Sequence, residues 1–456
     1  MLKKRFGALL MALFILGGLV LSAAPVVSAA GYPLPEDVVV HAPSAILVSL
    51  AGDPANDVVL YEKEADAVHA PGSMMRYMVM AQALTAIEEQ GLDLDKDTGT
   101  YTTELFNNFV AGTGVNTANM AFGETWTLRD LLTVSFMQSA SDAVTVLAVT
   151  VSGSVNAFIQ GMNDLANKLG CDYTHFSNLT GLDSLGQYTT ARDMARIVRY
   201  CQGFSEFENL AEKYQVEVNP KSGGSKRTII SANNLLQPSS SYRYTPIVHS
   251  RTGLSEHEGR TCASVARQGG YEYLVVVMGC PDQNEDGEYN LHYLDTIALL
   301  KWAFAQFEYK TILGKSEILG TLPVELNMNT DHVNLVPAEE VSTVVDANLP
   351  VEQIIRKVTI FEKSVEAPVQ KGTVYGKAEL IINVDQKIGE MDLVASESLS
   401  ESWVLVTKKK VGDFFTSTWF WLGVAILVAL VIAYIVLNIV HNHRRRQQRM
   451  RKINRD

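Results

Sequence analysis

The sequence is poor in cysteine, in charge and in basic residues. Four cysteines among 456 residues are too few for a small scaffold held together by disulfides. Charged residues make up 19% of the chain and hydrophobic residues 47%, which excludes a disordered protein. The formal net charge is −12, so the chain lacks the basic excess that nucleic-acid binding requires.

The cysteines are expected to be buried free thiols. Cys262 and Cys280 fall in two neighbouring strand-like runs joined by Gln-Gly-Gly. Hairpin register places Cys262 opposite about Val276, and therefore not opposite Cys280. No zinc-ligand spacing occurs in the sequence, so we expect neither a metal site nor a cofactor.

Long apolar runs are confined to the two ends of the chain. Basic residues at positions 3–5, an apolar run and the small residues Val27-Ser28-Ala29 predict a signal peptide over residues 1–29. The second run, Trp419–Val440, has 22 residues and is long enough to span a bilayer. It predicts a transmembrane helix within residues 415–440.

The last 16 residues, 441–456, carry six Arg and one Lys against one Asp. The positive-inside bias predicts that this basic tail lies in the cytoplasm and that the preceding chain lies outside, anchored to the cell membrane by a single C-terminal span. A further hypothesis is that the tail engages anionic lipid or a cytoplasmic protein, which would make the chain a membrane sensor.

The pattern between these ends predicts an α+β fold followed by a small β domain. Strand patterns come first, helical patterns follow, and a strand pair and one helix close the first region. The expected strands and helices of this region are 44–50, 57–62, 127–139, 142–150, 155–169, 190–201, 260–267, 271–279 and 295–307, with a further helix that begins at Ser73 and ends at Gly91. Short alternating segments over residues 315–406, such as 341–345, 354–361, 379–384 and 391–396, predict the β domain.

Three short motifs follow one another along the chain: Ser73-Met-Met-Arg76, Ser139-Ala-Ser141 and Arg251-Thr252-Gly253. Together with the stretch 176–183 they resemble the D-alanyl-D-alanine carboxypeptidases, which are low-molecular-mass penicillin-binding proteins with the motifs Ser-x-x-Lys, Ser-x-Asn and Lys-Thr-Gly. The resemblance implies a β-lactamase-like domain over residues 35–310, an antiparallel sheet with a helical cluster. It also implies peptidoglycan stem peptides ending in acyl-D-Ala-D-Ala as substrate, and β-lactams as ligands.

The resemblance assigns roles to the motif residues. Ser73 is expected to be the nucleophile and Ser139 a proton relay, with backbone N–H groups at Ser73 and after Gly253 as the oxyanion hole. Ser141, Arg251, Thr252 and Gly253 are expected to bind substrate. An arginine at position 251 keeps the positive charge that holds the substrate's carboxylate.

Position 76 is the most consequential departure, because the family has lysine there. A serine hydroxyl needs a nearby base, and a guanidinium stays protonated. Weakened catalysis is therefore expected. His249 could act as a compensating base if it reaches Ser73, since on a strand it shares a face with Arg251; the alternative is that it only narrows the cleft.

Two functions stay open from the sequence. One is a serine D-Ala-D-Ala carboxypeptidase with weakened turnover, and the other is an inactive homologue that binds stem peptide or a cell-wall partner.

Two further patterns are not expected to be functional sites. Ser231-Ala-Asn233 matches the second motif by coincidence. The acidic loop 282–287 lacks the Glu that completes a calcium loop, because Tyr293 stands at position twelve.

Overall fold

The computed structural model describes residues 32–184, 186–382 and 386–453. The predicted signal peptide at 1–29 lies outside the described residues. The chain divides into two compact units, one made of Met1–Lys310 with Thr343–Pro350 and one made of Thr311–Ser342 with Val351–Asp456. The division falls within strands β10 (Phe307–Leu313) and β13 (Val341–Asp346).

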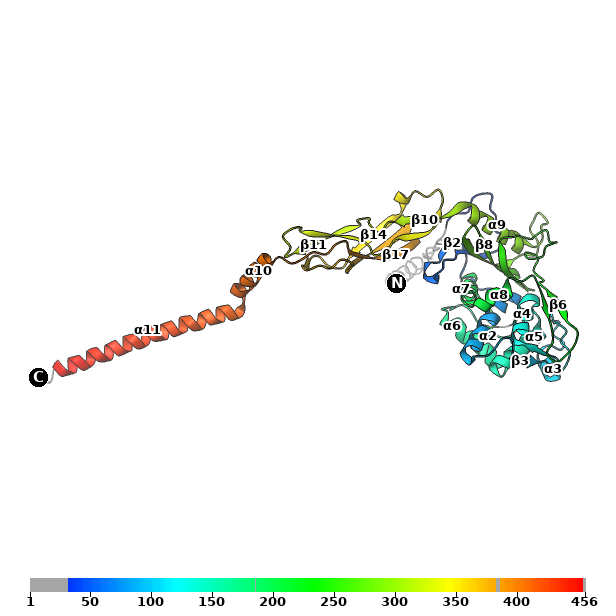
Figure 1. The fold of residues 1–456 in the computed structure, drawn as a ribbon, viewed down its shortest axis with the longest axis horizontal. Helices are drawn as coiled ribbons and strands as arrows, with labels where there is room; N and C mark the ends of the chain where they lie inside the picture. Colours follow the sequence, from blue (N-terminus) through cyan, green and yellow to red (C-terminus); the bar gives the residue numbers. More distant parts are fainter. Residues whose placement is uncertain (1–31, 185, 383–385, 454–456) are drawn as a thin grey trace, which may run out of the picture. The chain divides into compact units, whose positions relative to one another are not determined.

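The first unit is built on a five-stranded sheet with every neighbouring pair antiparallel (Figure 1). Its strands, in spatial order, are β2 (Val58–Lys63), β1 (Ser44–Ser49), β9 (Tyr271–Cys280), β8 (Gly259–Gln268) and β7 (Ile247–Ser255). Residues 273–278 of β9 are all buried, although alternate residues point to opposite faces. Both faces of the sheet are therefore covered.

Helix α9 (Leu291–Gln306) packs on β8 and β9, and the remaining helices form a cluster on the other side of the sheet (Figure 1). The cluster consists of α2 (Arg76–Gln90), α3 (Thr103–Phe109), α4 (Leu128–Gln138), α5 (Ser141–Ser152), α6 (Val155–Lys168), α7 (Ala191–Cys201) and α8 (Ser205–Ala211). Two small strand pairs accompany it, β3 (Thr98–Thr100) with β4 (Thr125–Thr127) and β5 (Gln215–Val218) with β6 (Arg227–Ile230).

Helix α2 lies at the centre of the core, because its side chains are buried around most of its circumference. Met78 and Met80 have no exposed surface, and neither do Met74 and Met75 just before the helix. Such all-round apolar character is typical of a buried helix. Gly91 ends the helix in the left-handed conformation (φ 66°), as the sequence predicted.

The second unit contains a six-stranded sheet. Its strands, in spatial order, are β14 (Ile355–Ile360), β16 (Val374–Ile382), β17 (Gln386–Ala395), β12 (His332–Pro337), β11 (Gly320–Glu325) and β15 (Val365–Glu366). All neighbours are antiparallel except β11 and β15, which are parallel. The expected small β domain is therefore present.

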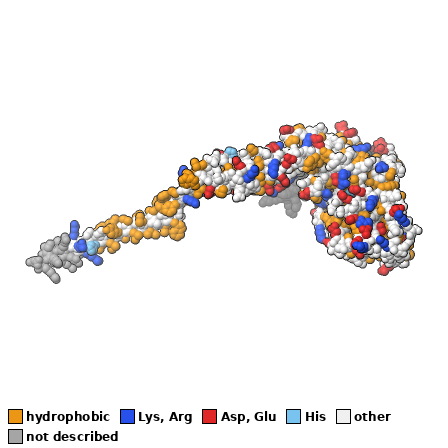
Figure 2. Space-filling model, in the orientation of Figure 1, with side chains coloured by type: hydrophobic (Ala, Val, Ile, Leu, Met, Phe, Trp, Pro, Cys, Tyr) orange, Lys and Arg blue, Asp and Glu red, His pale blue; other side chains and the backbone are white. Residues whose placement is uncertain are grey.

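The unit continues into two helices, α10 (Trp403–Thr416) and α11 (Thr418–Ile453). By length and composition, the segment Thr418–Arg446 of α11 is able to cross a membrane, with a mean hydropathy of 2.8 over its most apolar window. Figure 2 shows hydrophobic side chains along this helix and basic ones near its C-terminal end.

The cysteine prediction is confirmed in the described structure. All four cysteines are buried and free. Cys262 pairs in register with Val277, one residue from the expected partner, because a bulge interrupts the pairing of β8 and β9 between Arg260 and Cys262.

Candidate active site

Ser73 lies in a 3₁₀ turn, Gly72–Met75, that leads directly into α2. The turn brings Ser73 beside β7, and Ser73 stays partly exposed while its neighbours Gly72 and Met74 are buried. In the described part of the chain, its hydroxyl has no hydrogen-bond partner. A general base must lie within hydrogen-bond reach of the proton that it removes, so no base is poised on Ser73 here.

Glycines allow three backbone segments to meet at Ser73. A Cβ added to Gly181 would lie 2.8 Å from the Ser73 nitrogen, and one added to Gly253 would lie 2.4 Å from the Pro71 carbonyl oxygen. These contacts are with backbone atoms, which cannot rotate away. The loop at Gly181 and strand β7 therefore approach the nucleophile more closely than any residue with a side chain would permit.

Arg76 is completely buried and joins the other segments of the site. Its Nη2 atom donates to the Ser139 carbonyl oxygen at 3.1 Å and lies 3.4 Å from Ser141 Oγ. Nη1 donates to the carbonyl oxygen of Leu179, and Nη2 also reaches that of Thr180 at 3.5 Å. Four contacts with residues 139–141 and 179–180 hold the guanidinium in place.

The protonation of Arg76 excludes it as a base. Burial, reinforced by the nearby cation of Arg251, lowers the pKa of Arg76 to about 9, against a weaker opposing influence from Asp142. The group is still cationic at neutral pH. Since its partners at these distances are oxygen acceptors, Arg76 donates in every hydrogen bond and has no site for another proton.

Ser139 links the two arginines. It follows α4 in the left-handed conformation (φ 54°), which is uncommon for a residue other than glycine. Its carbonyl oxygen accepts from Arg76, and its hydroxyl oxygen accepts from Nη2 of Arg251. The Ser139 hydroxyl, which a proton relay would use, therefore faces a donor, Arg251, that stays protonated at neutral pH.

Arg251 is directed into the protein, with 4% of its surface exposed. Its Nη1 donates to the Met137 carbonyl oxygen at 3.2 Å, and its guanidinium carbon lies 5.4 Å from the centre of the Phe136 ring. Burial lowers its pKa to about 10, so it is also cationic at neutral pH. Thr252, the next residue, is only partly buried, and Gly253 is buried.

Asp142 is a site residue whose importance the sequence did not reveal. It lies in the first turn of α5, whose N-cap is Ala140. The buried carboxylate accepts hydrogen bonds from the backbone nitrogens of Ala118 (2.8 Å), Met120 (3.0 Å) and Ala143 (2.9 Å). It thereby holds the 118–120 loop against the start of α5.

His249 lies in an aromatic cluster. Its Nδ1 is 3.0 Å from the Tyr77 hydroxyl, its ring packs edge-on against Phe207, and its Nε2 is buried without a partner. No hydrogen bond joins His249 to Ser73 in the described structure. His249 therefore packs within this buried cluster, and both its role as a base and a narrowing of the cleft stay predictions.

We expect His249 to make the protein less stable in acid. Burial, with a smaller contribution from Arg267, lowers its pKa to about 3. His249 is therefore protonated near pH 6.5 in the unfolded chain, but only near pH 3 in the folded chain. The free energy of unfolding should fall as pH decreases through this window, by up to about 1.4 kcal/mol per pH unit.

Urea unfolding between about pH 7 and pH 5 measures this slope. His249→Gln should make the slope shallower, whereas His257→Gln, at an exposed position, should leave it unchanged. An identical slope in the His249 variant would contradict the assignment.

Two sequence patterns have structural explanations. Asn233 is buried and donates to Ser250 Oγ at 2.8 Å, so the Ser-Ala-Asn segment supports β7 from behind. In the acidic loop, Asp282 pairs with Arg260, and the Asn284 amide donates to Glu288. No cluster of three or more potential metal ligands occurs among the described residues.

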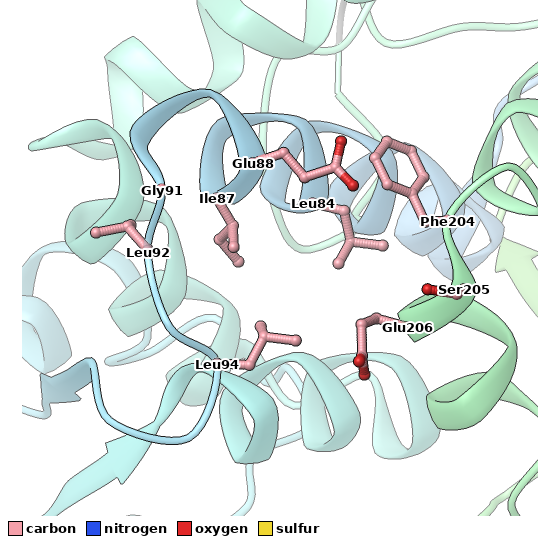
Figure 3. Close-up of a pocket in the computed structure, with 9 residues that line it drawn as sticks. All are labelled: Leu84, Ile87, Glu88, Gly91, Leu92, Leu94, Phe204, Ser205 and Glu206. Carbon is pink, nitrogen blue, oxygen red and sulfur yellow. The ribbon is translucent and has the colours of Figure 1, made fainter.

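A cavity of about 310 Å³ lies at the opposite end of α2 from Ser73 (Figure 3). Leu84, Ile87 and Phe204 form its apolar lining, and Glu88 and Glu206 are its carboxylates. None of the motif residues lines it. The cavity is therefore separate from the candidate active site.

The sequence and the described fold match known proteins. Residues 32–282, more than half of the chain, match the family described as D-alanyl-D-alanine carboxypeptidase. The chain belongs to this family. Residues 307–401 match the C-terminal domain of penicillin-binding protein 5. The expected family and fold class are thus confirmed.

Individual members of the D-alanyl-D-alanine carboxypeptidase family are distant relatives. DacF of Bacillus subtilis is 23% identical, over 78% of this chain and 86% of its own. DacC of Escherichia coli is 28% identical, over 80% and 85%. The crystal structure of penicillin-binding protein 5 from Haemophilus influenzae shares the fold, with a TM-score of 0.62 at 21% identity, over 81% of this chain and all of that one.

The family's motifs place the three departures of this D-alanyl-D-alanine carboxypeptidase homologue at neighbouring points. Arg76 and Arg251 stand where the motifs have lysine, and Ser141 stands where they have asparagine. Arg76 contacts Ser139 and Ser141, and Arg251 contacts Ser139. The three departures therefore lie within one connected set of hydrogen bonds.

Proposed function

We propose that this chain is an extracytoplasmic, membrane-anchored homologue with strongly weakened catalysis on stem peptides that end in D-Ala-D-Ala. Its family acts on peptidoglycan, which supports the substrate class. One observation carries the proposal of weakened catalysis. Arg76, which stands at the position of the expected base, is a buried cation that donates to carbonyl oxygens of Ser139 and Leu179.

The chemistry of acylation explains the weakness. The Ser73 oxygen must bond to the carbonyl carbon of the scissile peptide while its proton passes to a base and then to the leaving amine. Arg76 and Arg251 both remain protonated, and the Ser139 hydroxyl oxygen accepts from Arg251, so neither arginine can take a proton from it. Loss of a general base costs about 10²–10⁴-fold in rate.

Covalent labelling with a fluorescent penicillin tests this proposal. We expect the native full-length protein, purified in detergent, to label no faster than its Ser73→Ala variant. Arg76→Lys should label measurably, and the label should disappear in Arg76→Lys combined with Ser73→Ala. Fast labelling of the native protein at Ser73 would refute weakened catalysis.

A second candidate function is binding without turnover. Positive charge is retained at positions 76 and 251, although the ability to exchange a proton is lost. Thr252 is partly exposed beside Arg251, as a substrate-binding residue must be. Saturable binding of an acyl-D-Ala-D-Ala peptide without release of D-alanine would favour this function over slow hydrolysis.

The proposed anchor makes a separate prediction. A helix with the length and hydropathy of α11 should keep the protein in the membrane fraction after washing with high salt or alkali, and truncation before Thr418 should release it. Protease added outside intact cells should digest the ectodomain and spare an epitope fused after Asp456. Digestion of that epitope would contradict the proposed orientation.

A further inference from the structure

The end of β7 lies against the 3₁₀ turn that carries Ser73. Leu254, the residue after Gly253, is expected to supply one backbone N–H group of the oxyanion hole, and Ser73 is expected to supply the other. A Cβ added to Gly72 would lie 2.6 Å from the Leu254 nitrogen. The two expected donors are therefore on segments in direct contact, and their spacing depends on how firmly the end of β7 is held.

Pairing within the sheet holds β7 on one side. In the described sheet, β7 is an outer strand and pairs with β8. The other side of an outer strand has no strand partner for its backbone. The turn that joins the two strands, Ser255–Gly259, makes the further contacts that hold the end of β7 beside Ser73.

Asp183 ties this turn to the loop that contains Gly181. Its Oδ2 atom accepts from the Ser255 hydroxyl at 2.8 Å and from the Glu256 backbone nitrogen at 2.9 Å. The same loop approaches Ser73 closely, because a Cβ added to Gly181 would lie 2.8 Å from the Ser73 nitrogen. One short segment thus contacts the nucleophile through its glycine and holds the turn through its carboxylate.

Glu258 ties the other side of the turn to the segment that leads into Ser73. Its Oε2 atom accepts from the Ala70 backbone nitrogen at 2.8 Å and lies 3.2 Å from His69 Nδ1. His69 also exchanges two backbone hydrogen bonds, of 2.8 and 2.9 Å, with Thr189. The segments 69–73, 181–189 and 253–258 are therefore joined pairwise into a closed ring around the nucleophile.

We propose that Asp183 and Glu258 are positioning residues, which hold the turn so that the backbone donors of Ser73 and Leu254 face one oxygen of a tetrahedral adduct. Hydrogen bonds from backbone N–H groups to carboxylates are charge-assisted and strong enough for this role. Preorganised donors stabilise an oxyanion without accepting a proton. The inference rests on the proposed function for Ser73 as nucleophile, and deepens it by assigning the part of the site that survives loss of the base.

Equilibrium binding of a boronic acid tests this positioning. The probe is N-acetyl-D-alanine with boron in place of the carboxyl carbon. The Ser73 oxygen bonds to boron, which keeps its two hydroxyl groups and gains the negative charge, while the serine proton passes to the buffer. An equilibrium needs no base in the protein, so the native full-length chain in detergent is the starting protein. Isothermal titration calorimetry measures Kd, and Ser73→Ala is the reference that cannot form the adduct.

We expect the native chain to bind the probe at least about tenfold more tightly than Ser73→Ala. Asp183→Ala and Glu258→Ala should each weaken binding by about tenfold, because misplacement of preorganised groups is costly. Asp183→Asn and Glu258→Gln keep an acceptor oxygen and should recover most of the affinity. Glu256→Ala, at an exposed residue of the same turn, is the matched control and should bind like the native chain.

Both carboxylates belong to exposed residues, so the alanine variants should fold, and melting temperatures check this. Where an alanine variant does not fold, Asp183→Glu or Glu258→Asp replaces it. These changes keep the charge and move the oxygens by one methylene, and they should weaken binding in the same way.

Loss of affinity in the alanine variant, with recovery in the amide variant at a similar melting temperature, supports the role of each residue. Native affinity in the alanine variant, or an equal loss in both variants, overturns it. A native chain that binds the probe no better than Ser73→Ala overturns the whole proposal. Penicillin labelling is a rate that depends on the base, so weakened catalysis can stand when the positioning fails, and the reverse.

Discussion

Replacing both Arg76 and Arg251 by lysine is expected to raise the rate of acylation by a fluorescent penicillin about 10²–10⁴-fold over the native chain. The single change Arg76→Lys supplies a group that can lose a proton. Arg251 nevertheless continues to donate to the Ser139 hydroxyl, which keeps that oxygen engaged. The second lysine frees Ser139 to take part in proton transfer, so the double variant should exceed the single one.

The comparison uses labelling rates at fixed penicillin concentration. Arg251→Lys alone is the matched control, because it changes the third motif and leaves Arg76 in place. We expect it to stay close to the native rate. Equal rates for the double variant and the native chain would show that something other than the two arginines limits acylation.

Asp142→Asn is expected to destabilise the protein by at least about 3 kcal/mol, because charge-assisted hydrogen bonds to buried groups contribute about 1.5–3 kcal/mol each. The carboxylate accepts from three backbone nitrogens, and an asparagine side chain offers one oxygen and a donor in its place. The substitution also removes the negative charge that acts on Arg76.

Chemical denaturation at neutral pH measures this loss. Asp164→Asn, at an exposed carboxylate that accepts from Gln160, is the matched control and should change the stability by less than about 0.5 kcal/mol. A loss of the same small size at Asp142 would mean that its three hydrogen bonds and its charge are not needed by the folded state.

Much of the fold could be predicted from the sequence, because the hydrophobic periodicity and the residues that end helices agree with the structure. The strand at 44–49, the helix ending at Gly91 and the hairpin of β8 and β9 all follow from local pattern. The helix predicted from Ser73 begins as a 3₁₀ turn at Gly72–Met75 and becomes α2 at Arg76. The short helices α3 and α8 were missed, since seven residues carry too little periodicity to identify a helix.

The sequence singled out the motif residues of the candidate site, but it did not reveal their contacts. Motif order indicated the importance of Ser73, Arg76 and Arg251. Nothing in the motifs showed that Arg251 turns inward onto Met137 and Ser139, because the direction of a long side chain depends on acceptors from other segments. The close approach of Gly181 to the Ser73 nitrogen is likewise a product of tertiary packing, although the Gly-Leu-Asp segment at 181–183 was a visible signal.

The two lysine-to-arginine changes have a common structural consequence. Each guanidinium reaches backbone carbonyl oxygens, at Ser139 and Leu179 for Arg76 and at Met137 for Arg251. Lysine could not bridge as many acceptors at fixed angles. The site is thereby cross-linked by hydrogen bonds among the segments that carry its motifs, and its groups hold their protons.

The most direct measurement is the release of D-alanine from an acyl-D-Ala-D-Ala peptide by the unmodified full-length protein. We expect a rate indistinguishable from that of Ser73→Ala, or at most a small fraction of the rate reached by the double lysine variant. Release by the unmodified protein that depends on Ser73 and equals or exceeds the rate of the double lysine variant would contradict it.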